Sequence, residues 1–270
     1  MTRLCRVFSL GGVTEYEVAW RYQKALLEHA CAANKRGEQV PDSLLVLEHA
    51  RVFTLGRGAT MANVKISPSA TAPSTPKVIR VERGGEVTWH GPGQLVAYPI
   101  LNLNHHKRDL HWYTTSLEET VIRALSHFGV GAGRNKVNTG VWVGQNKISA
   151  IGVTASRWHT MHGVSINVCN SLYDYASIVP CGIAAEETGM SVCRLVDSLH
   201  PDPSGGSGRG EGLEGLSDAF RGQFLQSFAQ VFGLELVVES QPLSSLDQLI
   251  ATNPTAAALP AAGGALGVVR

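Results

Sequence analysis

Short apolar runs punctuated by glycine and proline dominate this sequence, and three longer stretches with helical spacing interrupt them. We predict strands over residues 43–49, 77–82, 94–100, 161–168 and 234–239, and a strand that runs into a turn over 53–58. Residues 140–153 are predicted to form a hairpin that turns at Gly144-Gln145-Asn146. The helical stretches cover residues 14–37, 110–128 and 217–233. Because strands outnumber helices and hairpins mix with crossover helices, the pattern predicts an α/β (α+β) fold with a mixed β-sheet and flanking helices.

Local signals place the ends of these helices. Thr14-Glu15-Tyr16-Glu17 has the pattern of a capping box, and Gly37 supplies the stop of the same helix. Gly129 and Gly233 end the second and third helices, and Ser217 is predicted to cap the third.

Composition sets the size of the fold and excludes two classes of protein. The chain has 270 residues, of which 44% are hydrophobic, so we predict one domain over residues 1–250. Residues 201–215 read as a flexible Gly-rich insertion, and residues 251–270 as an Ala/Gly/Pro-rich disordered tail. A net charge of +1 argues against broad nucleic-acid binding. The sequence contains no run of 18 apolar residues, so we do not expect a membrane-spanning helix.

The cysteines and the N-terminal residues bear on the compartment. The chain has five cysteines and no CxxC pair, which favours a reducing compartment over a disulfide framework. The first fourteen residues carry Arg3 and Arg6 and no acidic residue, a weak likeness to a transit peptide. A helix with acidic residues follows at once, so we do not predict cleavage.

Residues 83–94 (RGGEVTWHGPGQ) hold four glycines and a proline, which predicts irregular structure. One interpretation is a tight loop between two strands. The other is a binding loop whose backbone amides approach a ligand closely. The segment is neither a GxxxxGK[ST] phosphate loop nor a GxGxxG dinucleotide fingerprint.

Lys147 and Cys181 are candidate catalytic residues with ordinary alternatives. Lys147 follows the hairpin turn, where a lysine is usually solvated, but its apolar neighbours predict partial desolvation. Cys181 lies in a Pro-Cys-Gly bend, where a thiolate activated by a nearby cation would be a nucleophile; most lone cysteines are instead buried and inert. His90 and His162 are alternative bases. His105, His106 and His111 lack the ligand context of zinc, so no metal is expected.

At these positions the sequence resembles the lipoyl(octanoyl) transferases of lipoate synthesis. The matching stretches are RGGEVTWHGPGQLVAYPI (83–100), TGVWVGQNKISAIGV (139–153), HGVSINV (162–168) and IVPCGI (178–183). The resemblance implies a catalytic domain similar to those of biotin and lipoate protein ligases. The implied reaction moves an octanoyl group from the phosphopantetheine of acyl carrier protein to one lysine of a lipoyl domain.

The resemblance also implies residue roles. Cys181 would form the acyl thioester, and Lys147 would lower the pKa of that thiol and shuttle the proton. The residues implied to line the acyl and pantetheine site are Arg83, Gly84, Gly85, Glu86, Val87, Thr88, Trp89, His90, Ala150, Ile151, Gly152, Gly163, Val164 and Ser165.

The same resemblance predicts the partners and the setting. The expected partners are octanoyl-acyl carrier protein, lipoyl domains of 2-oxoacid dehydrogenase E2 subunits and glycine cleavage H protein, with no nucleic acid and no membrane. No cofactor beyond the carrier-bound donor and no ATP is expected, and we predict a monomer. Likeness to plant-type members favours the mitochondrion, with a plastid or a bacterial cytoplasm as alternatives.

Three other functions fit the sequence less well. An ATP-dependent lipoate or biotin ligase on the same fold would need an adenylate site and no cysteine nucleophile. An octanoyl amidotransferase would use the cysteine but take its acyl group from another lipoyl carrier. An acyl-binding module would bind octanoyl donors without turnover.

Overall fold

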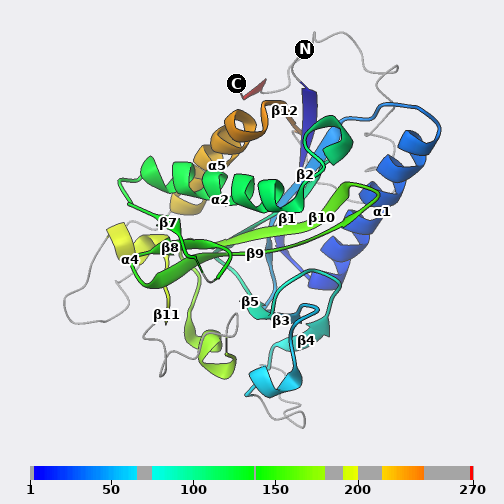
Figure 1. The fold of residues 1–270 in the computed structure, drawn as a ribbon. Coiled ribbons are helices and arrows are strands. Elements are labelled where there is room, and N and C mark those ends of the chain that lie inside the picture. Colours follow the sequence, from blue (N-terminus) through cyan, green and yellow to red (C-terminus); the bar gives the residue numbers. More distant parts are fainter. Residues whose placement is uncertain are drawn as a thin grey trace.

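A large mixed sheet forms the centre of the computed structural model, which describes residues 3–65, 75–136, 138–179, 191–199 and 215–239 and the backbone of 268–269 (Figure 1). Its strands run in the order β13 (Val268–Val269), β12 (Leu234–Val238), β1 (Arg3–Thr14), β2 (Asp42–His49), β6 (Gln94–Ile100), β10 (His159–Asn167), β9 (Asn146–Ser156), β8 (Val141–Val143) and β7 (Gly133–Arg134). A further strand, β11 (Ser191–Val192), pairs with β9. Because β1 is parallel to β12 and β2 while the strands from β2 to β7 are antiparallel, the predicted mixed sheet is confirmed.

Helices cover both faces of this sheet. On one face α2 (Leu110–Ser126) lies beside α5 (Leu216–Phe232), and α1 (Tyr16–Lys35) packs on the other (Figure 1). Side chains of a strand alternate between faces, so Leu44 and Val46 of β2 enter the core under α2 and α5, while Leu45 and Leu47 pack against α1. A short helix, α4 (Leu195–Leu199), follows β11.

A second, three-stranded sheet packs beside the first. It consists of β4 (Lys77–Arg80), β3 (Val52–Leu55) and β5 (Val87–His90). The 3-10 helices η1 (Met61–Asn63), η2 (Leu103–His105) and η3 (Tyr173–Ser177) lie in connections.

The prediction that residues 83–94 are irregular throughout is wrong for Val87–His90, which form strand β5. These residues pair antiparallel with β3 and place Trp89 in the core of the small sheet, which outweighs the flanking glycines.

The first described residues form the long strand β1, which the sequence pattern did not reveal. Its register with β2 shifts between Ser9 and Val13, and Gly11 and Gly12 there have φ of 72° and 51°. The two glycines allow this bulge because a left-handed backbone costs glycine little. The weak likeness of this segment to a transit peptide thus falls on a strand of the central sheet.

Two predicted helix caps are wrong, whereas the three glycine stops are confirmed. Thr14 pairs with His49 at the end of β1, so α1 begins after Glu15 with no side-chain cap. Ser217 lies inside α5, which begins after Gly215 in a left-handed conformation. Past the three helix ends, Gly37, Gly129 and Gly233 have φ of 75°, 72° and 62°.

Several predictions fall on residues that the structure does not describe. The Gly-rich insertion at 201–215 lies outside the described residues except for Gly215, as does the tail at 251–270 except for the backbone of Val268–Val269, which pairs with β12. The boundary of the domain at residue 250 stays a prediction. Among the described helices, none combines the length and the apolar character needed to cross a bilayer.

Candidate active site

A cavity of about 220 Å³ opens on the face of the large sheet that carries α1, between β6, β9 and β10 and the small sheet. It gathers segments that lie far apart in the sequence. The predicted site residues that line it are Arg83, Gly85, Glu86, Val87, Thr88, His90, Lys147, Ala150, Ile151, Gly152, Gly163, Val164 and Ser165.

Small residues on two neighbouring strands create this cavity. Ala150 lies opposite Ser165, and Gly152 lies opposite Gly163, all on the cavity side of β9 and β10. Elsewhere on the same face, larger side chains such as Leu45 fill the space below α1. Cross-strand pairs without bulk leave room above the sheet, so the sequence of these two strands determines where a ligand can lie.

Gly84 and Trp89, both predicted to bind substrate, do not line the cavity. Trp89 faces the other side of β5, where its Nε1 donates to Asp174 Oδ2 at 3.0 Å and its ring packs against Tyr175. The Gly84 amide donates to the Val153 carbonyl at 3.0 Å, which fastens the Gly-rich segment to β9. Both residues therefore stabilise the segments that form the cavity wall without lining the cavity themselves.

Arg83 lines the cavity, but its guanidinium holds the protein together. Its Nη1 donates to the carbonyls of Gly84 and Glu86, and its Nη2 donates to both oxygen atoms of Thr54. With four hydrogen bonds inside the chain, the planar fork shapes the Gly-rich segment.

Lys147 reaches the cavity because β9 contains a β-bulge. Trp142 of β8 pairs with Lys147, but Val141 pairs with Ser149, so Ile148 is the extra residue. The bulge turns Ile148 into the core under α2 and Lys147 toward the cavity. The lysine is 5% exposed, and its Nζ lies 5.6 Å from the centroid of the Trp142 ring. The predicted desolvation of Lys147 is confirmed.

Cys181 lies outside the described residues, but the chain on either side of it is attached to the cavity wall. The Val179 amide donates to the Asn63 carbonyl at 2.9 Å, and the Asn63 side chain donates to Glu86. After the gap, Val192 pairs with Lys147 in β11, and the Cys193 amide donates to the Lys147 carbonyl at 3.1 Å. Before the gap the chain is thus linked through Asn63 to Glu86 of the cavity lining, and after the gap it bonds Lys147 directly.

The structure adds lining residues that sequence reasoning did not assign to the site. They are Tyr16, Val96, Tyr98, Asn138, Thr139 and His162. Only His162 had a signal, as an alternative base in a glycine-containing segment. The two tyrosines come from α1 and β6, where the pattern indicates core residues, and only packing brings them together.

A buried polar cluster, formed by Tyr16, His49, His90, Tyr98 and His162, closes one side of the cavity. His162 Nδ1 lies 3.4 Å from the Tyr16 hydroxyl and its Nε2 lies 3.7 Å from Glu82, while the Tyr98 hydroxyl lies 2.7 Å from His49. Burial lowers the pKa of His49 to about 4 and lowers the pKa of His90 and His162 as well. Burial also raises the pKa of both tyrosines, so near neutral pH the cluster is uncharged.

Of the three histidines considered as metal ligands, His106 makes other polar contacts. His106 lies with Nε2 2.9 Å from Asp42 and with Nδ1 2.9 Å from the Arg3 guanidinium. Over the described ranges, no three histidine, cysteine or acidic side chains come close enough together to hold a metal ion. The absence of a metal stays a prediction for the whole chain.

Known proteins resemble this chain over most of its length. A family model described as the lipoyl protein ligase A/B catalytic domain matches residues 15–201. An octanoyltransferase of Thermosynechococcus vestitus is 41% identical over 90% of this chain and 95% of its own length. A chloroplastic octanoyltransferase of Arabidopsis thaliana is 41% identical over 91% of this chain and 84% of its own.

Solved structures of lipoate ligases share the fold. Lipoate-protein ligase A bound with ATP superposes with a TM-score of 0.62 at 14% identity, over 93% of this chain and 92% of that one. A putative lipoate protein ligase from T. acidophilum with bound lipoic acid gives 0.61 at 13% identity, over 93% of each chain. At such identities the likeness concerns the fold alone, and it confirms the predicted lipoate-ligase-like domain.

Proposed function

The chain belongs to the octanoyltransferases, acyltransferase enzymes within the lipoyl protein ligase A/B family, and from this premise we propose a mechanism through Cys181 and Lys147. The donor is octanoyl-acyl carrier protein, and the acceptor is a lysine of a lipoyl domain. The observation that carries the proposal is that Lys147 is buried and that a β-bulge directs its side chain toward a cavity lined by small residues.

The first half of the reaction forms an enzyme thioester. The Cys181 thiolate attacks the carbonyl carbon of the octanoyl thioester, and the tetrahedral intermediate expels the phosphopantetheine sulfur. The Lys147 ammonium gives its proton to that leaving sulfur. One carbon–sulfur bond forms as another breaks, so this step is nearly balanced in free energy.

The second half forms the amide. The amine of the acceptor lysine attacks the Cys181 thioester, the new carbon–nitrogen bond forms, and the carbon–sulfur bond breaks. The neutral Lys147 amine takes the proton that the acceptor nitrogen loses, which returns the thiolate and ammonium to their starting state. A thioester becomes an amide, so the step runs downhill without ATP, and no cofactor is proposed.

The cavity suits an uncharged acyl group with one polar end. Val96, Ala150, Gly152 and Gly163 provide a small or apolar lining on the cavity side of the large sheet, and the polar cluster beside them is neutral near pH 7. Thr88 Oγ1 is buried and has no hydrogen-bond partner among the described residues. A substrate carbonyl or amide is the kind of group that would pair with such a hydroxyl.

Intact-protein mass tests the mechanism. We expect one octanoyl adduct after brief incubation with octanoyl-acyl carrier protein without ATP, absent in Cys181→Ser and discharged by apo-lipoyl domain. Cys193→Ser is the matched control, because the Cys193 backbone amide bonds the Lys147 carbonyl just after β11, while burial raises the pKa of the Cys193 thiol to about 12. It should acylate normally.

Each other outcome of that experiment counts against the proposal. An adduct that persists in Cys181→Ser would refute the nucleophile, and no adduct would refute the thioester route. Acylation that needs free acid with ATP would indicate a ligase. A comparison of octanoyl-acyl carrier protein with an octanoylated lipoyl carrier as donor separates the amidotransferase.

The compartment follows from the relatives only in part. They include cyanobacterial proteins and a chloroplastic one, which supports a plastid or a bacterial cytoplasm. The mitochondrial location expected from the sequence stays a prediction, as do the monomeric state, the lipoyl domains of E2 subunits and the glycine cleavage H protein as acceptors.

A further inference from the structure

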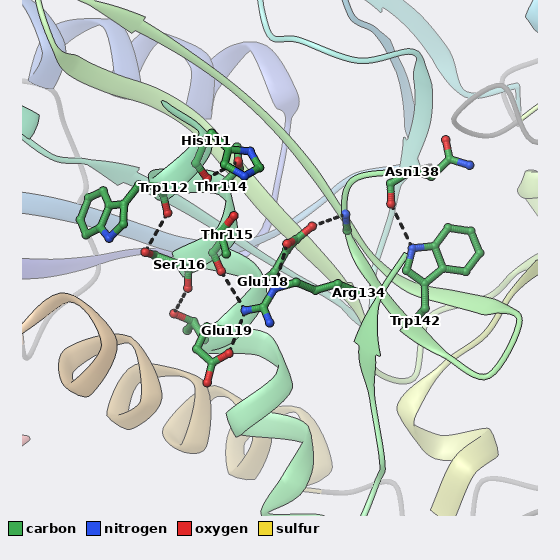
Figure 2. Close-up of polar contacts among 12 residues, drawn as sticks. His111, Trp112, Thr114, Thr115, Ser116, Glu118, Glu119, Arg134, Asn138 and Trp142 are labelled. Atoms are coloured by element: carbon green, nitrogen blue, oxygen red, sulfur yellow. Dashed lines mark hydrogen bonds and ion pairs between the residues drawn. The ribbon is translucent and has the colours of Figure 1, made fainter. Parts of the chain in front are cut away.

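Glu118 is a buried acidic residue that lies outside the cavity, on the helix that covers the opposite face of the sheet. It belongs to α2, is 7% exposed, and makes two polar contacts (Figure 2). Its Oε1 accepts from the Gly140 amide at 2.9 Å, and its Oε2 accepts from the Arg134 Nε at 3.2 Å. A hydrogen bond to a carboxylate is about twice as strong as a neutral one, so this contact holds Gly140 firmly.

Gly140 in turn lies directly against the Lys147 side chain. A Cβ added to Gly140 would be 2.6 Å from Lys147 Cε and 3.4 Å from Lys147 Nζ, and it would overlap the Ser149 carbonyl. The φ of Gly140 is 131°, in the region that favours glycine. The position of the Gly140 backbone therefore limits where the lysine can lie.

The residues on either side of Gly140 complete a wall around Lys147. Asn138 and Thr139 line the cavity, and the Asn138 carbonyl accepts from Trp142 Nε1 at 3.3 Å (Figure 2). Trp142 pairs with Lys147 across β8 and β9 and packs its ring near the ammonium. We call residues 138–142 the lysine wall; Trp142 holds one end, and Glu118 holds its middle.

We infer that Glu118 is a positioning residue for octanoyl transfer, which acts by holding the lysine wall and so the Lys147 ammonium in place. The inference rests on the role proposed above for Lys147. Arg134 keeps the Glu118 carboxylate paired and also donates to Glu119 and to the Thr115 carbonyl, so the pair is anchored along α2. A reacting group displaced by about 1 Å can lose up to about 10²-fold in rate.

Glu118→Ala tests this inference, with Glu118→Gln as the conservative variant. The amide oxygen of glutamine still accepts from Gly140, whereas alanine leaves that N–H without its partner. We expect kcat for octanoyl transfer to fall about 10- to 100-fold in Glu118→Ala and to recover to within about threefold in Glu118→Gln. The KM for octanoyl-acyl carrier protein should stay within about twofold in both.

Glu119→Ala is the matched control. Glu119 is the next residue of α2 and pairs with the same Arg134, but it makes no contact with Gly140. Its transfer rate should equal that of the unmodified protein. An equal loss in Glu119→Ala would assign the effect to Arg134 and α2 and would overturn the inference.

A double-mutant cycle on thiol alkylation separates positioning from a general structural effect. Glu118→Ala should raise the pH midpoint of Cys181 alkylation in the same direction as Lys147→Ala. The double variant should alkylate like Lys147→Ala alone, because Glu118 acts through that lysine. Additive shifts would overturn the inference. Should Glu118→Ala not fold, Glu118→Asp replaces it, since the shorter side chain keeps its charge but withdraws from Gly140.

The same measurements distinguish this inference from the proposed function. If Lys147→Ala transfers octanoyl normally, the proposed function fails. If Lys147→Ala is inactive while Glu118→Ala keeps its rate and its alkylation profile, only the positioning role fails.

Discussion

The Arg83 guanidinium bonds both oxygen atoms of Thr54, with Nη2 2.8 Å from the carbonyl and 2.8 Å from the hydroxyl. Since Nη1 donates to the carbonyls of Gly84 and Glu86, one side chain joins the Gly-rich segment to β3. The family resemblance implies that Arg83 contacts substrate, whereas in the structure its guanidinium stabilises the wall of the cavity.

Arg83→Lys should therefore destabilise the fold as well as slow transfer. A lysine cannot reproduce the planar fork, so buried carbonyls lose partners at a cost of about 2 kcal/mol or more in unfolding free energy. Urea unfolding measures this loss. Arg57→Lys is the control, because Arg57 is exposed and, among the described residues, its side chain donates a hydrogen bond only to Thr154. An Arg83→Lys protein with unchanged stability but a raised KM would indicate direct substrate binding instead.

Buried histidines should make stability fall in mild acid. The pKa of His49 is about 4 in the fold because burial disfavours the charged ring, whereas an unfolded histidine titrates near about 6.5. Between these values the unfolded chain binds a proton that the folded chain does not, so stability is lost as pH falls through this window. For His49 the loss is about 3 kcal/mol, and His90 adds to it because its pKa is lowered too.

Urea midpoints at about pH 7 and about pH 4.5 measure this dependence. His49→Asn should reduce the difference between the two midpoints, because the titrating ring is gone. His127→Asn, at an exposed position, should leave the difference unchanged. A His49→Asn protein with the full acid loss would contradict the assignment.

Gly163→Ala should damage both the sheet and the cavity. A Cβ there would overlap the Ala97 carbonyl of β6 and lie 2.8 Å from Pro99 Cδ, so β10 and β6 would have to separate. Forcing extra volume into a packed site costs about 1–3 kcal/mol. Thermal melting and transfer rate are the measurements. Gly131→Ala, where nothing lies within 4 Å of an added Cβ, should change neither.

Two glycines, one inside α5 and one directly after its last residue, should respond oppositely to alanine. Gly222 is exposed inside the helix with nothing near an added Cβ, so Gly222→Ala should stabilise the protein by about 0.5–1 kcal/mol. Gly233 ends the helix with a φ of 62°, where alanine is strained by about 1–2 kcal/mol. Melting temperatures of both variants check the pair, and a shift of the same sign in both would contradict the backbone argument.

Hydrophobic periodicity located most of the elements because it reports which face of a helix or strand is buried. The α2 helix, the hairpin of β8 and β9, and strands β2, β6 and β10 follow the predicted spacing within a few residues. The misses have a common cause. Thr14 had a capping pattern, yet a sheet partner at His49 holds it in β1, and Val87–His90 became a strand because β3 offered an edge.

By itself the sequence determined the fold class and the family and predicted most of the cavity lining, because these depend on local spacing and on four contiguous motifs. Only the tertiary structure decided which motif residues face the cavity. Strand alternation turned Trp89 away, a one-residue bulge turned Lys147 inward, and the packing of α1 on the sheet brought Tyr16 to His162. The direction of a side chain depends on register and on neighbours distant in the chain, which no local pattern records.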